Sequence, residues 1–277
     1  ETSQANVTIS DNDAPVFGTD STPTSGTTDD SFTFTIAVTD NIGVSGVYVE
    51  YWYGTGSHTN SSMSGSGPYT LTVTLPSGST DSLHYIFQAS DSAGNWDETS
   101  QANVTISDND APVFGTDGSG TAGTTGETFD FSIAVTDNIG VNGVYVEYWF
   151  GTGSHTNTSM SGTGPYTHSV SVPSDSDDDL HYIFHAADSA GNWEETSQVD
   201  VTISDNDKPV FGTDSTPSSG TTGDSFTFNI AVTDNIGVTG VYVEYWYGSG
   251  SHTNTSMSGS GPYTLTVTLQ SGSTDSL

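Results

Sequence analysis

The 277-residue sequence predicts an all-β chain made of tandem sandwich domains. Two observations carry this prediction: apolar and polar residues alternate in short runs, and one long segment repeats along the chain. Alternation with a period of two is typical of strands that bury one face, and no stretch has the helical period. Aromatic residues make up 11% of the chain, which argues against the disorder that a hydrophobic fraction of only 31% would otherwise allow.

Seven runs of the first repeat fit strands. They span residues 15–20, 31–39, 47–53, 57–63, 69–75, 83–89 and 102–106. The second run alternates Phe32, Phe34, Ile36 and Val38, whereas the fourth is short and polar. The breaks between runs are rich in Gly, Ser, Asp and Pro, as turns require. Seven short strands with one apolar face each close most simply as two packed antiparallel sheets, which is the immunoglobulin-like β-sandwich.

The repeat defines the domain organisation. The opening segment ETSQANVTISDNDAPVFGTD recurs at Glu98 and, slightly changed, at Glu195, an offset of 97 residues both times. Residues 195–277 align without a gap on residues 1–83 and differ at ten positions. A period of 97 is too long for a solenoid turn or propeller blade and fits a whole sandwich domain.

We therefore place immunoglobulin-like repeats at residues 14–110, 111–207 and 208–277, of which the third lacks its last two strands. Residues 1–13 are then the last strand of a preceding repeat plus a linker. Because both ends fall inside a repeat and residue 1 is not Met, we interpret the chain as part of a longer secreted array.

A further signal supports the sandwich. The segment from Asp81 to Ala89 resembles the tyrosine corner that opens the sixth strand of such domains, with Tyr85 as the tyrosine. Phe87 then stands where antibody domains carry Cys, and the segment recurs around Tyr182.

The charge excludes several classes of function. Lys208 is the only Lys or Arg against 34 acidic residues, so no basic face exists for nucleic acid or anionic lipid. No apolar run approaches the roughly 18 residues that span a bilayer, and without Cys there is no disulfide framework. The seven His residues fall on repeated loops or on one strand with no unique catalytic constellation, so we predict that the chain is not an enzyme.

The acidic residues cluster in a pattern. Asp outnumbers Glu by 26 to 8, and in a seven-stranded sandwich the N-terminal linker lies at the same end as two loops, which join strands two to three and six to seven. For the first domain these places hold residues 11–13, 40–41 and 91–95. Folding would gather three or four carboxylates there with amide and backbone oxygens, a set that suits Ca²⁺ and neither Zn²⁺ nor copper.

The alternative interpretation is that Asp, Asn and Gly are turn formers whose acids are solvated at loop tips. Calcium is favoured because three motifs converge and recur at each junction, in a chain with almost no basic residue to neutralise them.

Three segments resemble known families. The linker Asp11-Asn12-Asp13-Ala14-Pro15-Val16-Phe17 resembles the calcium-binding linker of cadherin-type repeats. Residues 40–44 (DNIGV) and 91–95 (DSAGN) resemble bacterial and archaeal immunoglobulin-like repeats of large surface adhesins and surface-layer proteins. The resemblance implies calcium at each junction, where it stiffens a string of domains. The chain departs from animal cadherins in having no clear counterpart of the acidic motif after their first strand.

The residues that the resemblance implies as metal ligands fall into three groups. They are Asp11, Asn12, Asp13, Asp40, Asn41, Asp91 and Asn95; then Asp108, Asn109, Asp110, Asp137, Asn138, Asp188 and Asn192; then Asp205, Asn206, Asp207, Asp234 and Asn235.

Five sequons are candidate glycosylation sites. Asn60, Asn157 and Asn254 lie in the repeated Ser-His-Thr-Asn loop and are the better candidates, whereas Asn6 and Asn103 lie on a predicted strand.

An outward aromatic pair on the third strand is a candidate lateral or glycan contact. Its members are Tyr48 and Trp52, Tyr145 and Trp149, and Tyr242 and Trp246. The alternative is that the fourth strand or the glycine-rich loop covers these rings.

These features favour an extracellular structural protein, a calcium-rigidified repeat array that forms a stalk, surface layer or filament. The alternatives are a glycan- or cell-binding adhesin module and the spacer repeats of an extracellular hydrolase. Expected partners are copies of the chain itself, with donor-strand pairing through residues 1–9 as one form, and glycans or neighbouring cells. Nucleic acid and membrane insertion of this segment are not expected. The expected location is outside the cell, secreted or attached to its surface.

Overall fold

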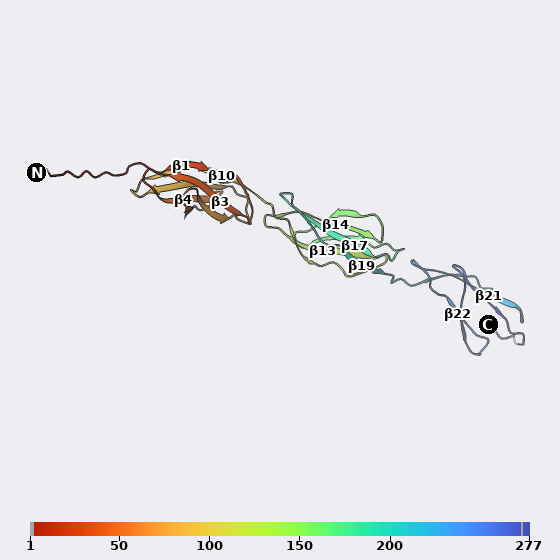
Figure 1. Ribbon diagram of the computed structural model, residues 1–277. Coiled ribbons are helices and arrows are strands. Elements are labelled where there is room, and N and C mark those ends of the chain that lie inside the picture. Colours follow the sequence, from red (N-terminus) through yellow and green to blue (C-terminus); the bar gives the residue numbers. More distant parts are fainter. Residues whose placement is uncertain (1–2, 273) are drawn as a thin grey trace. The chain divides into compact units, whose positions relative to one another are not determined.

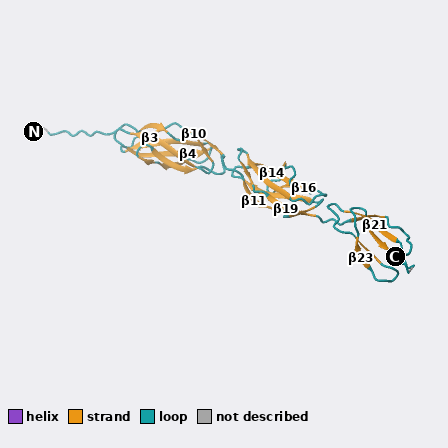
Figure 2. Cartoon of the chain, turned by 45° about the vertical axis from the view of Figure 1, so that its right-hand side comes forward, coloured by secondary structure: helices purple, strands orange, loops and turns teal. Residues whose placement is uncertain are grey.

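A computed structural model describes residues 3–272 and 274–277 (Figure 1). The described residues form strands joined by loops and turns, with no helix among them (Figure 2). Accordingly, no helix in this part of the chain is long and apolar enough to cross a membrane. The predicted all-β fold class is confirmed.

The first repeat contains ten strands. They are β1 (Val16–Asp20), β2 (Ser25–Thr27), β3 (Ser31–Thr39), β4 (Val44–Tyr53), β5 (Thr59–Ser62), β6 (Ser64–Gly65), β7 (Tyr69–Thr74), β8 (Leu83–Asp91), β9 (Trp96–Glu98) and β10 (Ala102–Ser107). Each of the seven predicted runs overlaps one strand. Strands β2, β6 and β9 were not predicted, because two or three residues are too few to show a period.

These strands form two sheets. One has the order β1-β3-β7-β6, and the other has the order β2-β10-β8-β4-β5, with β9 also paired to β8. Every pairing is antiparallel except that of β2 with β10, which is parallel. Strand β4 pairs along its length with β8, so that Val49 lies opposite Phe87.

The second repeat follows the same plan. Its strands are β11 (Val113–Asp117), β12 (Ala122–Thr124), β13 (Thr128–Thr136), β14 (Val141–Phe150), β15 (Thr156–Ser159), β16 (Tyr166–Ser171), β17 (Leu180–Asp188), β18 (Trp193–Glu195) and β19 (Val199–Ser204). The sheet orders are β11-β13-β16 and β12-β19-β17-β14-β15, with β18 paired to β17.

In the third repeat, five strands are described. These are β20 (Val210–Asp214), β21 (Ser225–Thr233), β22 (Tyr242–Tyr245), β23 (Thr253–Ser256) and β24 (Tyr263–Thr268), paired as β20-β21-β24 and β22-β23. Among the described strands of this repeat none matches β8 or β10, and Phe226 and Phe228 are half-buried where Phe32 and Phe34 of the first repeat are buried.

The chain forms two compact units. One comprises the described residues up to 115 with 134–144 and 185–195, and the other comprises 116–133, 145–184 and 196–277. The first unit therefore includes the two loops of the second repeat that carry Asp137 and Asp188. The boundaries 14–110, 111–207 and 208–277 follow the sequence repeat and stay a prediction.

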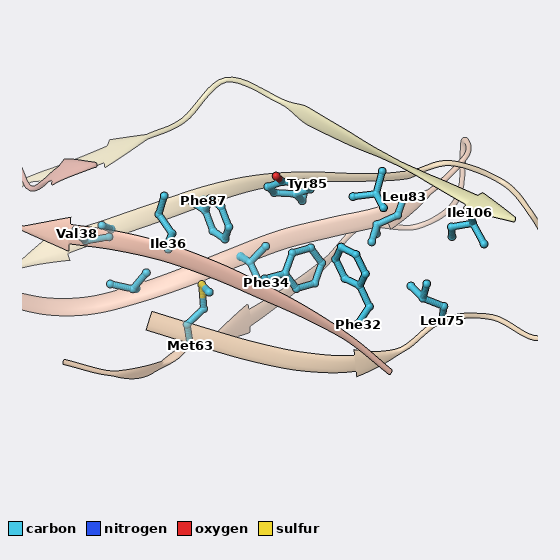
Figure 3. Close-up of a cluster of buried hydrophobic side chains, with 14 residues drawn as sticks. Phe32, Phe34, Ile36, Val38, Met63, Leu75, Leu83, Tyr85, Phe87 and Ile106 are labelled. Carbon is cyan, nitrogen blue, oxygen red and sulfur yellow. The ribbon is translucent and has the colours of Figure 1, made fainter. Parts of the chain in front are cut away.

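The core of the first repeat lies between its two sheets (Figure 3). Phe34 is fully buried at its centre and makes edge-to-face contacts with Tyr85 and Phe87, at centroid distances of 5.3 and 6.4 Å. Such pairs contribute roughly 0.5–1.5 kcal/mol beyond the burial of their area. The second run was predicted to bury its alternating residues, and all four of them, from Phe32 to Val38, are buried.

Tyr85 departs from the tyrosine corner it resembles. Its hydroxyl donates to Asp20 Oδ2 of strand β1 at 2.7 Å, and Tyr182 donates in the same way to Asp117 Oδ2. The tyrosine therefore ties its strand to the carboxylate of a distant strand, whereas the corner motif bonds to nearby upstream backbone. Burial and the bond to Asp20 raise the pKa of Tyr85 above its ordinary range.

Residues 3–15 form no strand. Val7 and Ile9 are 83% and 92% exposed, whereas Val104 and Ile106, which match them one repeat later, are buried. Strand β10 pairs with β8 and β2, and no comparable neighbours of residues 3–15 occur in the described part of the chain. The interpretation of this segment as a last strand, and its donor-strand pairing, stay predictions.

Candidate metal centre

Three aspartates of the first repeat converge at one end of the sandwich. Asp11 belongs to the linker, Asp40 follows β3, and Asp91 ends β8. Each offers one carboxylate oxygen, and the three oxygens lie within 4.8 Å of one another. The structure thus brings together carboxylates that are 29 and 51 residues apart in sequence.

The loops that hold these carboxylates explain their positions. Asp91 Oδ1 accepts hydrogen bonds from the backbone N–H groups of Ala93, Gly94 and Asn95 at 2.7–2.9 Å. Gly94 has a φ of +96°, a conformation that residues with a side chain rarely adopt. Asp40 Oδ1 similarly accepts from the two backbone N–H groups that follow Asn41, at 2.9 and 2.7 Å. One oxygen of each aspartate therefore caps its own loop.

The second oxygens have a different environment. Asp11 Oδ2 and Asp40 Oδ2 are buried and have no hydrogen-bond partner. A buried polar atom without a partner costs free energy, and more so when it is charged, which is why such atoms are rare in folded proteins. A cation placed between these two oxygens would satisfy both of them.

The arrangement recurs one repeat later. Carboxylate oxygens of Asp108, Asp137 and Asp188 lie within 4.8 Å of one another, and Asp108 Oδ2 and Asp137 Oδ2 are again buried without a partner. Asp188 Oδ1 accepts from the backbone N–H groups of Gly191 and Asn192. Recurrence at the sequence period shows that the geometry belongs to the repeat.

At the third predicted position only two of the aspartates lie within the sequence. Asp234 Oδ1 caps its loop as Asp40 does, with backbone N–H donors at 3.1 and 2.9 Å, and Asp205 is exposed. The 277-residue sequence contains no residue that matches Asp91 in this repeat.

The predicted asparagines donate hydrogen bonds, whereas the aspartates offer carboxylate oxygens. Asn95 Nδ2 donates to Asp91 Oδ2 at 2.7 Å and to the backbone carbonyls of Asp11 and Asp13 at 3.4 and 3.1 Å. Asn192 makes the same three bonds one repeat later. These two side chains therefore fasten the linker to the loop. Asn41 donates to Asp11 and Asp13 across the same linker.

The middle residue of each linker points elsewhere. Asn12, Asn109 and Asn206 are exposed, and Asn109 Nδ2 donates to Asp30 Oδ2 at 3.3 Å. Asp13 and Asp207 are exposed as well, and Asp110 is half-buried. Their role as ligands has less geometric support than that of the converging triads.

Asn138 links the site to the preceding repeat within the first compact unit. Its Nδ2 donates to Asp110 Oδ2 at 2.8 Å and to the carbonyl of Ser77 at 2.9 Å. The hydroxyl of Thr28, a residue only 1% exposed, lies 3.0 Å from Asp108 Oδ1 and 2.9 Å from Asp110 Oδ2. A loop of one repeat therefore supports the site of the next.

The same support recurs within the second unit. Asn235 Nδ2 donates to the carbonyl of Ser174 at 2.8 Å and to Asp205 Oδ1 at 3.2 Å, and Thr125 Oγ1 donates to Asp205 Oδ1.

Asn138 Oδ1 and Asn235 Oδ1 are buried and have no hydrogen-bond partner. Sequence reasoning missed Thr28 and Thr125, because a threonine in a polar loop carries no distinguishing signal.

The ionisation of Asp91 and Asp188 suits a cation. Burial works against the charge of Asp91, but hydrogen bonds from the Asn95 side chain and from three backbone N–H groups hold its pKa below the usual value. The pKa of Asp188 is lowered by the corresponding bonds, against the same opposing burial. Both carboxylates are therefore ionised at neutral pH, as metal ligands must be.

The predicted aromatic contact needs correction. Trp52 and Trp149 are only 8% exposed, because His58 and His155 stack on their indole rings at centroid distances of 3.9 and 3.8 Å. His58 Nδ1 in turn lies 2.7 Å from Glu50 Oε1. Both histidines lie in the loops that lead into β5 and β15. These loops cover the indole rings, so Trp52 and Trp149 do not form an exposed surface on which a glycan could stack.

The other predicted aromatic residues differ among repeats. Tyr48 is half-buried and stacks on Trp96 at 5.8 Å, and Tyr145 is half-buried too. Tyr242 and Trp246 of the third repeat are 65% and 41% exposed, although His252 stacks on Trp246.

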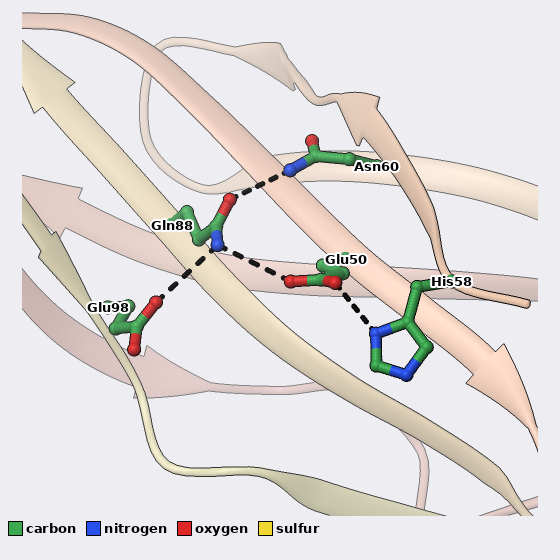
Figure 4. A network of polar contacts seen from close by, with 5 residues as sticks. All are labelled: Glu50, His58, Asn60, Gln88 and Glu98. Atoms are coloured by element: carbon green, nitrogen blue, oxygen red, sulfur yellow. Dashed lines mark hydrogen bonds and ion pairs between the residues drawn. The ribbon is translucent and has the colours of Figure 1, made fainter. Parts of the chain in front are cut away.

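All five sequon asparagines are exposed. These are Asn6, Asn60, Asn103, Asn157 and Asn254. Asn60 Nδ2 donates to Gln88 Oε1 at 2.8 Å, at the edge of a polar network on the outer face of the sheet (Figure 4). Glycosylation of these residues stays a prediction.

Comparison with known proteins identifies the fold. No protein-family model matches the chain, and no curated protein matches it. Among solved structures, the chain is similar to the I-band fragment I67-I69 from titin, with a TM-score of 0.50 and 17% identity over 93% of this chain and 89% of that one. For an E-to-A mutated variant of the same titin domains the TM-score is 0.49 and the identity is 17%, with 92% of this chain and 88% of that one covered.

A tetra-tandem repeat in the extending region of a large adhesion protein gives a TM-score of 0.38 and 23% identity, over 88% of this chain and 63% of that one. At such identities only the titin likeness carries an argument, and it concerns the fold. The chain consists of tandem immunoglobulin-like domains.

Proposed function

We propose that this chain is part of an extracellular structural protein whose immunoglobulin-like repeats are held at each junction by Ca²⁺. The observation that carries the proposal is the pair of buried, unpartnered carboxylate oxygens in each aspartate triad. Desolvating two carboxylates beside a third, with no donor for either oxygen, is costly unless a cation occupies the space between them.

The chemistry of the donors favours calcium. Ca²⁺ binds oxygen at 2.3–2.6 Å, so two ligands on opposite sides of one ion lie up to about 5 Å apart. The oxygens of each triad fall within this limit. The described ligands are all oxygen atoms, whereas Zn²⁺ and copper prefer nitrogen and sulfur. Asp11, Asp40 and Asp91 would hold the first ion, with the remaining positions filled by backbone or water oxygens.

The proposed role of the ion is mechanical. It would tie the linker to two loops of the domain that follows, while Thr28 of the preceding domain bonds to the same linker at Asp108 and Asp110. A linker held from both sides loses conformational freedom, so the ion would order the connection between successive repeats. This mechanism suits a stalk, surface layer or filament assembled from copies of the chain.

The proposed location follows from the expected affinity. Sites of this kind in extracellular modules bind Ca²⁺ with dissociation constants of about 10⁻⁴–10⁻³ M, so they fill only where calcium is abundant. Antibodies against this segment are expected to label intact cells. Labelling that requires permeabilised cells would contradict the extracellular location and leave the metal site untouched.

Calorimetric titration of the whole chain with CaCl₂ tests the site itself. We expect binding at the two complete triads, and loss of both events in the double variant Asp40→Asn with Asp137→Asn. The matched control is Asp97→Asn with Glu194→Gln, which removes the same two charges from exposed carboxylates on β9 and β18. Equal binding by the double variant and the control would refute the proposed ligands.

A further inference from the structure

An exposed tryptophan stands on the outer face of the first two repeats. Trp96 on β9 and Trp193 on β18 are each 57% exposed, which is unusual for the largest side chain. Tyr48 stacks on Trp96 at a centroid distance of 5.8 Å and an interplanar angle of 26°. Tyr48 holds one side of the indole in place. The exposed part of the Trp96 ring is accessible to a partner.

A carboxylate lies on the same face of β9 as this ring. Glu98 lies two residues along β9 from Trp96, on the same face of the strand. Gln88 Nε2 lies 3.5 Å from Glu98 Oε2 and 3.5 Å from Glu50 Oε2, so one neutral amide serves two carboxylates (Figure 4). No lysine or arginine balances them, because Lys208 is the only one in the chain.

In the second repeat the corresponding place is hollowed. A shallow cavity of about 300 Å³ is lined by Trp193, His185, Glu194 and Glu195. His185, which replaces Gln88, lies 3.5 Å from Glu195 Oε2. The combination of an exposed indole and neighbouring carboxylates therefore occurs twice, at positions one repeat apart.

We propose that these two faces bind the cationic side chains of a basic polypeptide partner. An arginine or lysine over the open ring gains a cation–π interaction, and its charge is matched by the glutamates beside the ring. A second copy of this chain does not fit, because its net charge is −33. A neutral sugar would stack on the indole but would leave the carboxylates without a counter-charge. The proposal is independent of calcium binding at the domain junctions.

The test uses the whole chain in saturating CaCl₂ and two synthetic peptides. One is acetyl-Gly-Arg-Gly-Arg-Gly-amide, and the other carries the uncharged isostere citrulline in place of arginine. Affinity is measured by isothermal titration calorimetry in every variant, and NMR of the indole N–H signals shows which tryptophans the peptide contacts in the wild type. The variant Trp96→Ala with Trp193→Ala is compared with Val16→Ala with Val113→Ala, which alters two valines that are 63% and 64% exposed at matched positions of the two repeats.

Neither pair of substitutions alters the net charge. We expect the arginine peptide to shift the Trp96 and Trp193 signals, and its affinity to fall at least about threefold in the tryptophan variant and not in the valine variant. The citrulline peptide is expected to bind weakly or not at all. If the alanine variant does not fold, as judged by circular dichroism, the Phe substitutions at both positions replace it and are expected to bind with reduced affinity.

Unchanged affinity in the tryptophan variant would show attraction by bulk charge alone and overturn the proposal. Indole shifts with neutral oligosaccharides, together with none from the arginine peptide, would also overturn it and assign the face to sugar. Because calcium is saturating throughout, failure here does not bear on the metal site.

Discussion

At the scale of single residues, the two oxygens of one aspartate have separate tasks. Asp40 Oδ1 caps the loop after β3, while Asp40 Oδ2 is buried without a partner. The two sequence interpretations, turn former and metal ligand, therefore do not compete for this residue. The turn places the carboxylate, and the placement leaves Asp40 Oδ2 directed at the other aspartates of the triad, where the proposed cation would bind.

This division of tasks predicts that one substitution has opposite effects with and without calcium. Asp40→Asn keeps an oxygen that can cap the loop and removes a negative charge from the triad. We expect the melting temperature to be unchanged or higher in EGTA, because repulsion is relieved, and lower in millimolar CaCl₂, because a ligand is weakened. Differential scanning calorimetry measures both. A decrease of similar size in both buffers would mean that Asp40 is only a turn former.

The pH dependence of stability follows from Asp91. Its pKa is lower in the folded chain than the ordinary value of about 3.9, because hydrogen bonds from Asn95 and the loop backbone outweigh the opposing effect of burial. The resulting stabilisation is fully present above pH 4 and is lost as the pH falls through the folded pKa. Urea unfolding in EGTA between pH 7 and 3 should show a smaller loss for Asp91→Asn than for wild type. Parallel curves for the two proteins would contradict the assignment.

At the scale of elements, periodicity predicted the long strands and missed the short ones. Strand β3 matches its prediction because Phe32, Phe34, Ile36 and Val38 alternate over its whole length. Strand β4 begins three residues earlier than expected, at Val44, since a register shift between Val44 and Gly46 interrupts the alternation. Strand β2 has no apolar residue, and its pairing with β10 is set by tertiary structure.

Strand β2 nevertheless packs tightly against the core. A Cβ added at Gly26 would lie 2.5 Å from Leu75 Cδ1 and 3.2 Å from Phe32 Cδ2. We expect Gly26→Ala to lower the free energy of unfolding by about 1–3 kcal/mol, because overpacking displaces core side chains. Gly78→Ala is the control, since its nearest neighbour would be a carbonyl oxygen at 3.9 Å. Equal urea midpoints for the two variants would show that β2 moves away from the core without cost.

At the scale of the whole molecule, the sequence repeat predicted where the acidic motifs would meet. Once the sandwich is assumed, the linker and two loops must share one end, so the triads could be predicted from Asp11, Asp40 and Asp91 alone. The hydrogen bonds of Thr28 and the carbonyl of Ser77 to the following site could not, because they depend on the path of polar loops. For Trp52 the sequence left two alternatives open, an exposed contact or a ring covered by the fourth strand or the loop, and the choice depends on the rotation of His58 over the indole.

The direct test of the proposed metal centre is a crystal structure of the chain grown in calcium, with anomalous diffraction recorded to locate the ion. We predict an anomalous peak in each complete triad, with Asp40 Oδ2, Asp91 and Asp11 Oδ2 at 2.3–2.6 Å from the first ion and the matching oxygens of Asp137, Asp188 and Asp108 around the second. Triads that contain no anomalous peak, with Asp40 Oδ2 and Asp137 Oδ2 satisfied by water or backbone N–H groups, would contradict it.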